Sequence, residues 1–446
     1  MKPSLYAGAL SLLAVLTAAT ANAADAPPPA SARAPRSQEE LEQEIDELHR
    51  RLEILAAEVR KVKEAQTVPE KVELKSAYGM GPAASKVYAK ERGLSLGGYG
   101  EFNFKKEVAD QTGDDVFDFV RFVTYVGYKF TDKLLMNSEI EIEHASTDKG
   151  GSVSVEFAYL DYMWMPKLGL RAGLLLVPVG FINELHEPVT YHGNQRPELE
   201  RRIIPTTWRA NGGGIYGELL PGLSYRTYAI TSLRAEDFSS SNIRGGRQKG
   251  SQELANSWSW VGRLDYGPLP GLTFGASGYV GDQGQDQEIV TSRDPVTGDP
   301  ITTGTEAAFM QMYEGHAQWH WRGLELRALG VVNLLNDSSQ LSVNAQETIA
   351  QRMIGWYAEL AYNVMPLMLS DTNQYLAPWF RYSMINTQDQ VAAGLTPDGN
   401  DNNNTWEIGL DYKPIPQIVL KLDYRNETAE QGTRPDVVRI GGGFVF

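Results

Sequence analysis

Residues 134–143 read Leu134-Leu135-Met136-Asn137-Ser138-Glu139-Ile140-Glu141-Ile142-Glu143. From Met136 on, apolar side chains fall mostly at even positions and polar ones at odd positions, which is the period of a β-strand. Three glutamates share one face, and an apolar core would leave their charges without solvation. A water-filled lumen on that face and lipid on the other would suit both sets of side chains. The stretch therefore predicts a strand of a transmembrane β-barrel.

The same alternation returns along the chain from Gly93 to the carboxyl terminus. It recurs in segments 94–105, 120–129, 258–266, 324–333, 356–363, 418–425 and 438–446. Tight connections such as Leu220-Pro221-Gly222 alternate with long polar ones such as 233–255, and outer-membrane barrels have short turns at one end and long loops at the other. Counting the strands between connections predicts an all-β transmembrane antiparallel barrel of about 16 strands over residues 93–446.

Both ends of the chain indicate the bacterial outer membrane. Lys2, an apolar run over residues 5–19 and the small residues Ala21-Asn22-Ala23 predict a signal peptide over residues 1–23. The last strand ends on Phe446, which resembles the signal by which outer-membrane barrels are recognised for assembly. The chain has no cysteine, so the exported protein must be stable without disulfides. We expect outer-membrane lipid around the barrel.

A helix is predicted between two linkers. Residues 24–36 are rich in Pro, Ala and Ser, and residues 66–92 contain Pro69 and Pro82, which is typical of linkers. Residues 37–65 carry apolar side chains at heptad spacing, namely Leu41, Ile45, Leu48, Leu52, Leu55, Val59 and Val62. This spacing predicts a periplasmic coiled coil in a homo-oligomer, and its register leaves the number of chains open. The alternative for the helix is packing against its own domain. The coiled coil could also bind peptidoglycan, which would make the barrel a cell-wall tether with little conductance.

Charge and histidine content narrow the functional classes. The net charge of −15 argues against a nucleic-acid partner, because its phosphates would be repelled. The six histidines form no pattern with a nucleophile, so we expect no catalytic residues and no enzymatic activity. We also expect no cofactor and no metal, although His186 and His192 lie among carboxylates in one segment and keep a metal site as an alternative.

The pore loop is predicted between the fifth and sixth strands. We expect it to fold into the lumen, as the corresponding loop does in trimeric porins, and its arginines to contact solutes. The candidate constriction residues are Glu184, Glu187, Arg196, Glu198, Arg201, Arg202 and Arg209. Both charge signs are present in the loop.

Six arginines on separate predicted strands face the lumen by alternation. They are Arg121, Arg171, Arg226, Arg263, Arg327 and Arg381. Each could contact solutes, or could pair with an acid on a neighbouring strand and brace the wall, with about 0.2–1 kcal/mol per pair. Lumen-facing bases and acids balance overall, so the sequence leaves both roles open.

The pore-loop region resembles the phosphate-selective porin O and P family. The resemblance rests on Leu170-Arg171-Ala172-Gly173 running into Pro178-Val179-Gly180-Phe181, on Glu187-Pro188 and Arg196-Pro197-Glu198, and on the heptads before the barrel. It implies a trimer with anion-permeable pores. The chain departs from the family where Leu174-Leu175-Leu176-Val177 replace the basic residues expected before the loop, so phosphate specificity does not follow.

The function expected from the sequence is passive diffusion of small hydrophilic solutes, with anions such as phosphate among them. A sugar channel or another solute-selective channel is the alternative within transport. Its stacking surfaces would be Trp208, Tyr191, Tyr313 and Trp319, because sugar paths use strips of aromatic side chains.

Overall fold

The computed structural model describes residues 37–66, 74–109, 113–305, 308–370 and 372–446. The chain forms two compact units, residues 1–72 and 73–446. The first unit contains helix α1 (Gln38–Gln66), which lies where the heptads predict a helix. Its self-association stays a prediction. The signal peptide over 1–23 and the linker over 24–36 lie outside the described residues.

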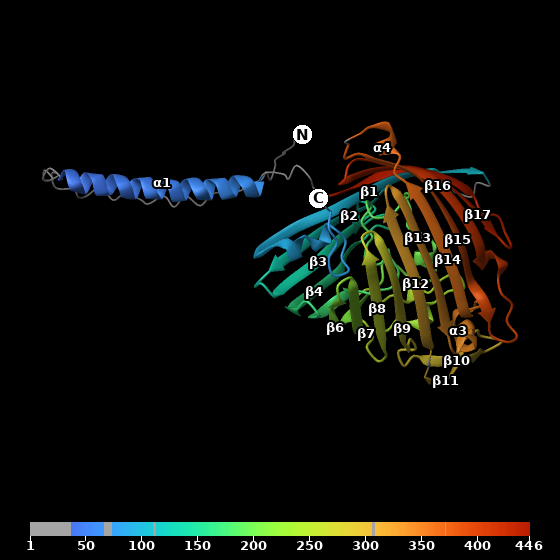
Figure 1. Ribbon diagram of the computed structural model, residues 1–446. Helices are drawn as coiled ribbons and strands as arrows, with labels where there is room; N and C mark the ends of the chain where they lie inside the picture. Colours follow the sequence, from blue (N-terminus) through green and yellow to red (C-terminus); the bar gives the residue numbers. More distant parts are fainter. Residues whose placement is uncertain (1–36, 67–73, 110–112, 306–307, 371) are drawn as a thin grey trace, which may run out of the picture. The chain divides into compact units, whose positions relative to one another are not determined.

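The second unit is a closed antiparallel barrel, as predicted, and its 16 strands are numbered β1–β9 and β12–β18 (Figure 1). The strands are β1 Gly93–Ala109, β2 Val116–Lys129, β3 Leu134–Glu143, β4 Val153–Met165, β5 Leu168–Leu176, β6 Arg209–Leu220, β7 Leu223–Thr231, β8 Trp258–Leu269, β9 Leu272–Asp282, β12 Phe309–Trp321, β13 Leu324–Leu335, β14 Ala350–Tyr362, β15 Tyr375–Val391, β16 Asn402–Ile415, β17 Ile418–Ala429 and β18 Asp436–Val445. Strands β10 (Glu288–Arg293) and β11 (Pro300–Thr305) form a separate hairpin between β9 and β12.

The wall has the two faces that the alternation predicts. On β3, Glu139 and Glu141 are buried while Ile140 between them is 40% exposed. Strand β8 follows the same rule, with Trp260 and Leu264 exposed and Arg263 buried. Apolar side chains therefore cover the outside of the barrel, and charged ones point inward.

Pairing between the first and last strands closes the barrel. Strands β1 and β18 are antiparallel, with Tyr99 opposite Val445. The backbone N–H of Phe446 donates to the carbonyl of Gly98 at 2.9 Å, and the Gly98 N–H donates back at 3.0 Å. The terminal residue thus belongs to the closing ladder, and its ring stacks on Phe122.

Short helices occupy the connections and the interior. They are η1 Ala84–Ala89, α2 Leu199–Arg202, η2 Ala235–Asp237, η3 Arg244–Gly246, α3 Ser338–Ala345, α4 Met365–Met368 and η4 Gly399–Asp401. Tight turns join β2–β3, β4–β5, β6–β7, β8–β9, β12–β13 and β16–β17. The long connections lie at the opposite end, with the β10–β11 hairpin and α3, whereas α4 lies at the tight-turn end (Figure 1). None of the described helices combines the length and apolar character needed to cross a bilayer.

The sequence predicts a linker over residues 66–92, but in the structure the second part of this segment is packed against the barrel. From Leu74 the chain packs against the barrel, and Met80, Ala83, Ala84 and Val87 are buried. A Cβ added to Gly127 of β2 would lie 2.7 Å from the Val87 side chain, so η1 sits directly on the inner wall. Residues 67–73 lie outside the described residues. We call residues 74–92 the inner segment.

Substituting Gly98 tests how closely the closing strands pack. In Gly98→Ala the new Cβ would lie 2.3 Å from the Val123 carbonyl oxygen and 2.6 Å from the Phe446 ring, so the backbone must shift. We expect the free energy of unfolding to fall by about 1–3 kcal/mol, measured by urea unfolding in detergent followed through tryptophan fluorescence. Gly315→Ala on β12 is the matched control, because its Cβ would meet no atom within 4 Å. An equal loss in both variants would contradict this account.

Candidate functional site

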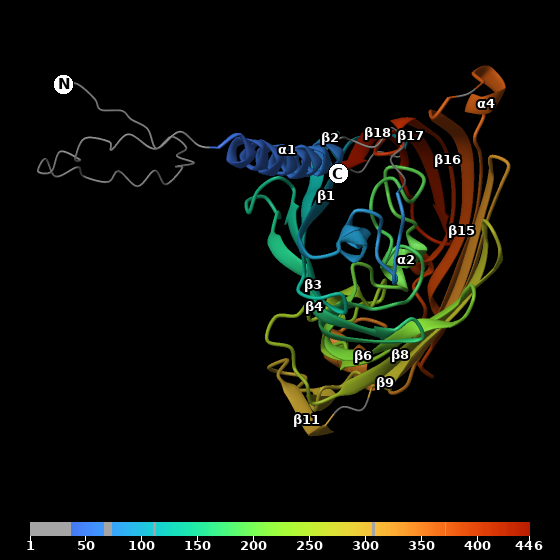
Figure 2. The same cartoon turned by 60° about the vertical axis from the view of Figure 1, so that its left-hand side comes forward.

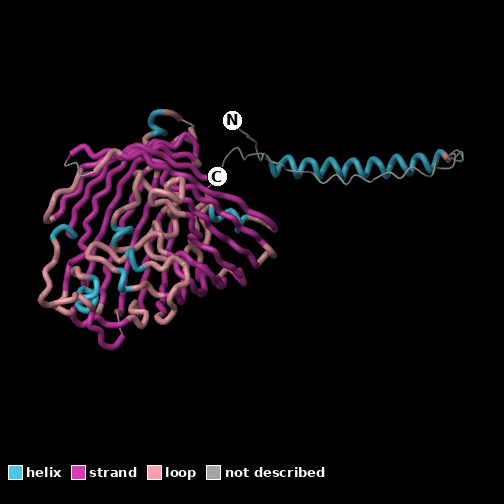
Figure 3. The backbone as a smooth tube through the Cα atoms, turned by 180° about the vertical axis from the view of Figure 1, so that it is seen from behind, coloured by secondary structure: helices cyan, strands magenta, loops and turns pink. Residues whose placement is uncertain are grey.

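The connection between β5 and β6, residues 177–208, folds into the barrel. Nearly all of it is buried, and within this fully described loop only Arg201 is exposed. Figure 2 shows its helix α2 inside the ring of strands, and in Figure 3 loop segments likewise run inside the wall of strands. The loop therefore lies between the fifth and sixth strands and folds into the lumen, as predicted. We call residues 177–208 the pore loop.

Cationic side chains of the wall hold the pore loop by its backbone. Arg327 donates to the Thr190 carbonyl at 3.1 Å, and Arg381 donates to the His192 carbonyl at 2.9 Å. The further donors to loop carbonyls are Arg263 to Gly180, Lys413 to Val189 at 2.9 Å, and Lys421 to Tyr191 and Gly193 at 2.9 and 2.8 Å. These bonds come from β8, β13, β15, β16 and β17, so much of the wall binds the loop.

Most of the six arginines predicted to face the lumen are paired with acids. Arg381 contacts Glu359 at 2.5 Å and Glu407 at 2.8 Å, on the two neighbouring strands. Arg226 contacts Glu184 of the loop at 3.0 Å and Asp265 at 2.6 Å. The remaining pairs among the six wall arginines are Arg121 with Glu101 and Glu141, Arg171 with Asp161, and Arg263 with Asp265 and Glu184. The geometry gives these side chains a bracing role.

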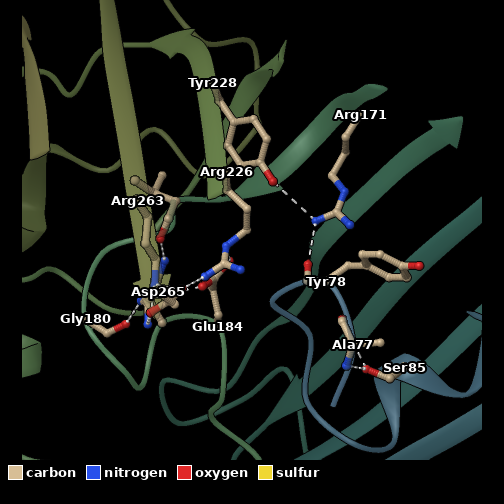
Figure 4. A network of polar contacts seen from close by, with 12 residues as sticks. Ala77, Tyr78, Ser85, Arg171, Gly180, Glu184, Arg226, Tyr228, Arg263 and Asp265 are labelled. Atoms are coloured by element: carbon tan, nitrogen blue, oxygen red, sulfur yellow. Dashed lines mark hydrogen bonds and ion pairs between the residues drawn. The ribbon is translucent and has the colours of Figure 1, made fainter. Parts of the chain in front are cut away.

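Arg171 and Glu187 fix the inner segment. Arg171 donates to the Tyr78 carbonyl at 3.3 Å (Figure 4). It also donates to the Tyr88 hydroxyl at 2.9 Å. The Glu187 carboxylate accepts the backbone N–H groups of Ala83 and Ala84 at 2.8 and 3.2 Å. Glu187 therefore caps the start of η1, and it joins the pore loop to the inner segment rather than lining an open passage.

The other six candidate residues divide into three groups. Arg209 is buried against Glu156, with Nη1 at 2.6 Å from the carboxylate oxygen, and lines none of the principal cavities. Glu184 lines a cavity at the tight-turn end. The residues that line cavities at the long-loop end are Arg196, Glu198, Arg201 and Arg202. The structure thus brings four of the seven candidates together.

Two adjoining cavities lie at the long-loop end, and we call them together the basic vestibule. The larger, of about 620 Å³, is lined by seven cations and three acids. The cations are Lys105, Arg201, Arg202, Arg244, Arg425, Arg434 and Arg439, and the acids are Glu198, Asp401 and Glu427. The smaller, of about 290 Å³, shares Lys105, Arg201 and Arg244 with it and adds the cations Arg121 and Arg196 and the acids Glu101 and Asp118.

The cavity at the tight-turn end has a different lining. It measures about 560 Å³, and its walls include Tyr78 of the inner segment, Glu184 of the pore loop and Asp265 with His316 of the barrel. The charged groups here pair closely, since Asp265 contacts Arg226 at 2.6 Å and His316 at 2.9 Å. Acidic and basic side chains are nearly equal in number in this lining, whereas cations outnumber acids in the basic vestibule.

Arg244 adds a positive charge to the basic vestibule that no nearby acid among the described residues neutralises. Within the described part of the chain its guanidinium has no ion-pair partner, and its Nη1 atom has no hydrogen bond. Burial, and then the positive charges of Arg247, Arg196 and Arg201, lower the pKa of Arg244 below its ordinary value. Sequence alternation missed Arg244 and Arg434 because they lie on connections, where no strand period marks the inward direction.

His192 carries a further positive charge within the pore loop. Its ring contacts Asp411 at 2.9 Å and Glu325 at 3.4 Å. Burial alone would lower the pKa of His192, but the hydrogen bonds to these two carboxylates outweigh burial and raise it to about 9. His192 is therefore protonated at neutral pH and binds two strands of the wall.

The four aromatic residues considered for a sugar path do not lie together. Trp208 is buried against Tyr279, and Tyr191 is buried with its hydroxyl donating to Glu101 at 2.7 Å. Tyr313 and Trp319 are exposed on β12. These four residues therefore form no continuous aromatic strip along the lumen.

Comparison with known proteins places the barrel among porins by fold. No protein-family model matches the chain. An OmpT loop-deletion mutant from Vibrio cholerae has a TM-score of 0.51 at 11% identity, over 80% of this chain and all of that one. OmpF of Salmonella typhi has a TM-score of 0.51 at 13% identity, over 80% and 98% of the chains. The outer-membrane channel DcaP of Acinetobacter baumannii has a TM-score of 0.50 at 15% identity, over 79% and 97%.

A relative with clear sequence similarity comes from Aquifex aeolicus. That uncharacterized protein is 36% identical over 384 residues, which cover 82% of this chain and 83% of the relative. The similarity is far above that of the solved porins and extends over most of both proteins. The chain therefore belongs to the same family as the Aquifex aeolicus protein, and its barrel has the fold of outer-membrane porins.

Proposed function

We propose that this chain is an outer-membrane porin through which small hydrophilic solutes diffuse passively, with a preference for anions. The observation that carries the proposal is the basic vestibule, where seven cations face three acids in its larger cavity. A cavity whose lining carries an excess of one sign of charge raises the local concentration of ions of opposite sign. Anions would therefore collect at the long-loop end, above the pore loop.

Phosphate is a candidate solute within this proposal. The basis is the resemblance of the pore-loop region to phosphate-selective porins, together with guanidinium groups such as Arg201 and Arg244 in the basic vestibule. Guanidinium groups bind phosphate through paired hydrogen bonds. We further propose a trimer in the outer membrane, with the α1 helices associated in the periplasm and available to peptidoglycan.

A cell-wall tether is the competing function, and a conductance measurement separates the two. Purified protein in a planar lipid bilayer should give stepwise currents in KCl, with a reversal potential in a salt gradient that indicates anion preference. Phosphate, added to chloride solutions, should reduce the chloride current if it binds in the vestibule. Absence of current from folded protein would favour the tether instead.

Removing charge from the basic vestibule should weaken anion preference. In the double variant Arg201→Ala with Arg244→Ala, the lining loses two cations whose charge raises the local anion concentration. We expect the permeability ratio of chloride to potassium to fall at least about twofold, measured from reversal potentials. Lys133→Ala, on the exposed β2–β3 turn, removes charge at the other end and should leave the ratio unchanged. Equal ratios in wild type and double variant would contradict the vestibule's role.

Raising the pH should remove the proton from His192 and so weaken the contacts that hold the pore loop. Its pKa of about 9 exceeds its ordinary value, so its contribution to loop stability is present below about pH 6.5 and is lost as pH rises through 9. We expect open-channel current noise to increase between pH 7 and pH 10, and His192→Gln to be noisy already at pH 7. His144→Gln, at an exposed histidine, should keep the wild-type dependence. Noise independent of pH would exclude His192 as a brace.

A further inference from the structure

Three buried side chains converge where the pore loop meets strands β3 and β4. Glu139 of β3, Glu156 of β4 and His186 of the loop each offer one ligand atom, and these atoms lie within 4.8 Å of one another. All three residues are at most 2% exposed. In the described part of the chain no other group of three histidine or carboxylate residues meets this geometry.

The ring of His186 is oriented as a metal ligand is. Its Nδ1 atom lies 3.2 Å from the Asn183 carbonyl oxygen, which can only accept, so Nδ1 carries a hydrogen. Its Nε2 atom lies 3.2 Å from Glu139 Oε1. Metal-binding histidines donate their second ring N–H to a carbonyl or carboxylate in this way, which leaves the other nitrogen for the ion.

Both carboxylates keep an oxygen available. Glu156 Oε1 accepts from Arg209 Nη1 at 2.6 Å and from Thr207 Oγ1 at 2.8 Å. Glu156 Oε2 and Glu139 Oε2 are buried without a hydrogen-bond partner among the described residues. Unpartnered buried carboxylate oxygens are costly, and a cation bound between them would satisfy both.

The spacing of the cluster suits a dication. Arg209 pairs with Glu156 at 2.6 Å and so neutralises one of the two carboxylates, and Arg196 also lies near, with Nη2 3.5 Å from the His186 carbonyl oxygen. Two ligands of a tetrahedral zinc ion are about 3.4 Å apart, close to the 3.2 Å between His186 Nε2 and Glu139 Oε1. The three ligand atoms lie within 4.8 Å of one another, so Glu156 would approach the ion on binding.

We propose that Glu139, Glu156 and His186 bind one divalent ion of the zinc class, which ties the pore loop to β3 and β4. An imidazole with two carboxylates suits zinc, whereas calcium takes six to eight oxygen ligands. His186 adjoins Glu187, which caps η1. The ion therefore fixes the loop at the point where it holds the inner segment. The site is independent of which solute passes the pore.

Two other buried histidines provide the contrast that defines the test. His316 faces Glu314 at 2.7 Å through Nδ1 and Asp265 at 2.9 Å through Nε2. His192 likewise meets its two carboxylates on opposite ring nitrogens. Carboxylates on opposite sides of a ring cannot share an ion with it, so these histidines should not contribute to zinc binding.

Zinc titration of the full mature protein tests the site. Protein in detergent is treated with a chelator, dialysed, and titrated with ZnCl₂ by calorimetry, with bound metal counted by mass spectrometry. We expect one saturable Zn²⁺ per chain, with affinity at least about tenfold weaker in Glu139→Gln and His186→Gln and unchanged in His316→Gln. Absence of saturable binding, or equal affinity in the first two variants and wild type, would overturn the proposal.

A measurement on the wild-type protein tests the site even if the variants fail to fold. The X-ray absorption spectrum of the zinc-loaded protein should show one imidazole nitrogen and carboxylate or water oxygens at roughly 2.0–2.2 Å. Two or more imidazoles around the zinc would place it elsewhere and refute the site. Channel conductance plays no part in either result, so failure of this proposal leaves the porin proposal standing.

Discussion

Hydrogen bonds from wall cations to backbone carbonyls of the pore loop are the interaction on which the interior depends. A loop buried inside a barrel has carbonyl groups that no sheet or helix satisfies, and an unsatisfied buried group costs about 1–3 kcal/mol. Arg327, Arg381 and Lys421 reach these carbonyls from three different strands. A charged donor gives the stronger class of hydrogen bond, so a few side chains hold a long irregular segment.

Wall acids neutralise only some of the cations that hold the pore loop. A cation buried against a neutral carbonyl is stabilised by a counter-ion, and Arg381 has Glu359 and Glu407 on its neighbouring strands. Arg327 also binds a loop carbonyl but has no ion-pair partner among the described residues. The basic vestibule, where cations outnumber acids, is lined in part by loop residues such as Arg201 and Arg202. Positive charge therefore remains in excess where the loop meets the long-loop end of the wall.

Sequence periodicity predicted the strands well because each strand's faces are set locally, by lipid on one side and lumen on the other. The inward direction of Glu139 and Arg381 followed from this period alone. Partners could not be predicted, because Glu187 contacts Ala83 across more than a hundred residues. The sequence predicts a linker over the inner segment because its Gly and Pro residues match a linker's composition. The contacts that bury the segment come from strands distant in the sequence.

The pore loop is held differently on its two sides. Toward β13–β17 the wall donates and the loop's carbonyls accept, as with Arg327 and Thr190. Toward the inner segment the loop itself accepts, since the Glu187 carboxylate receives the N–H groups of Ala83 and Ala84. Because Glu187 contacts the inner segment directly, displacement of that segment would leave a buried carboxylate unpaired. The positions of the inner segment and of the pore loop are therefore coupled, so residues that precede β1 help to set the course of the loop inside the barrel.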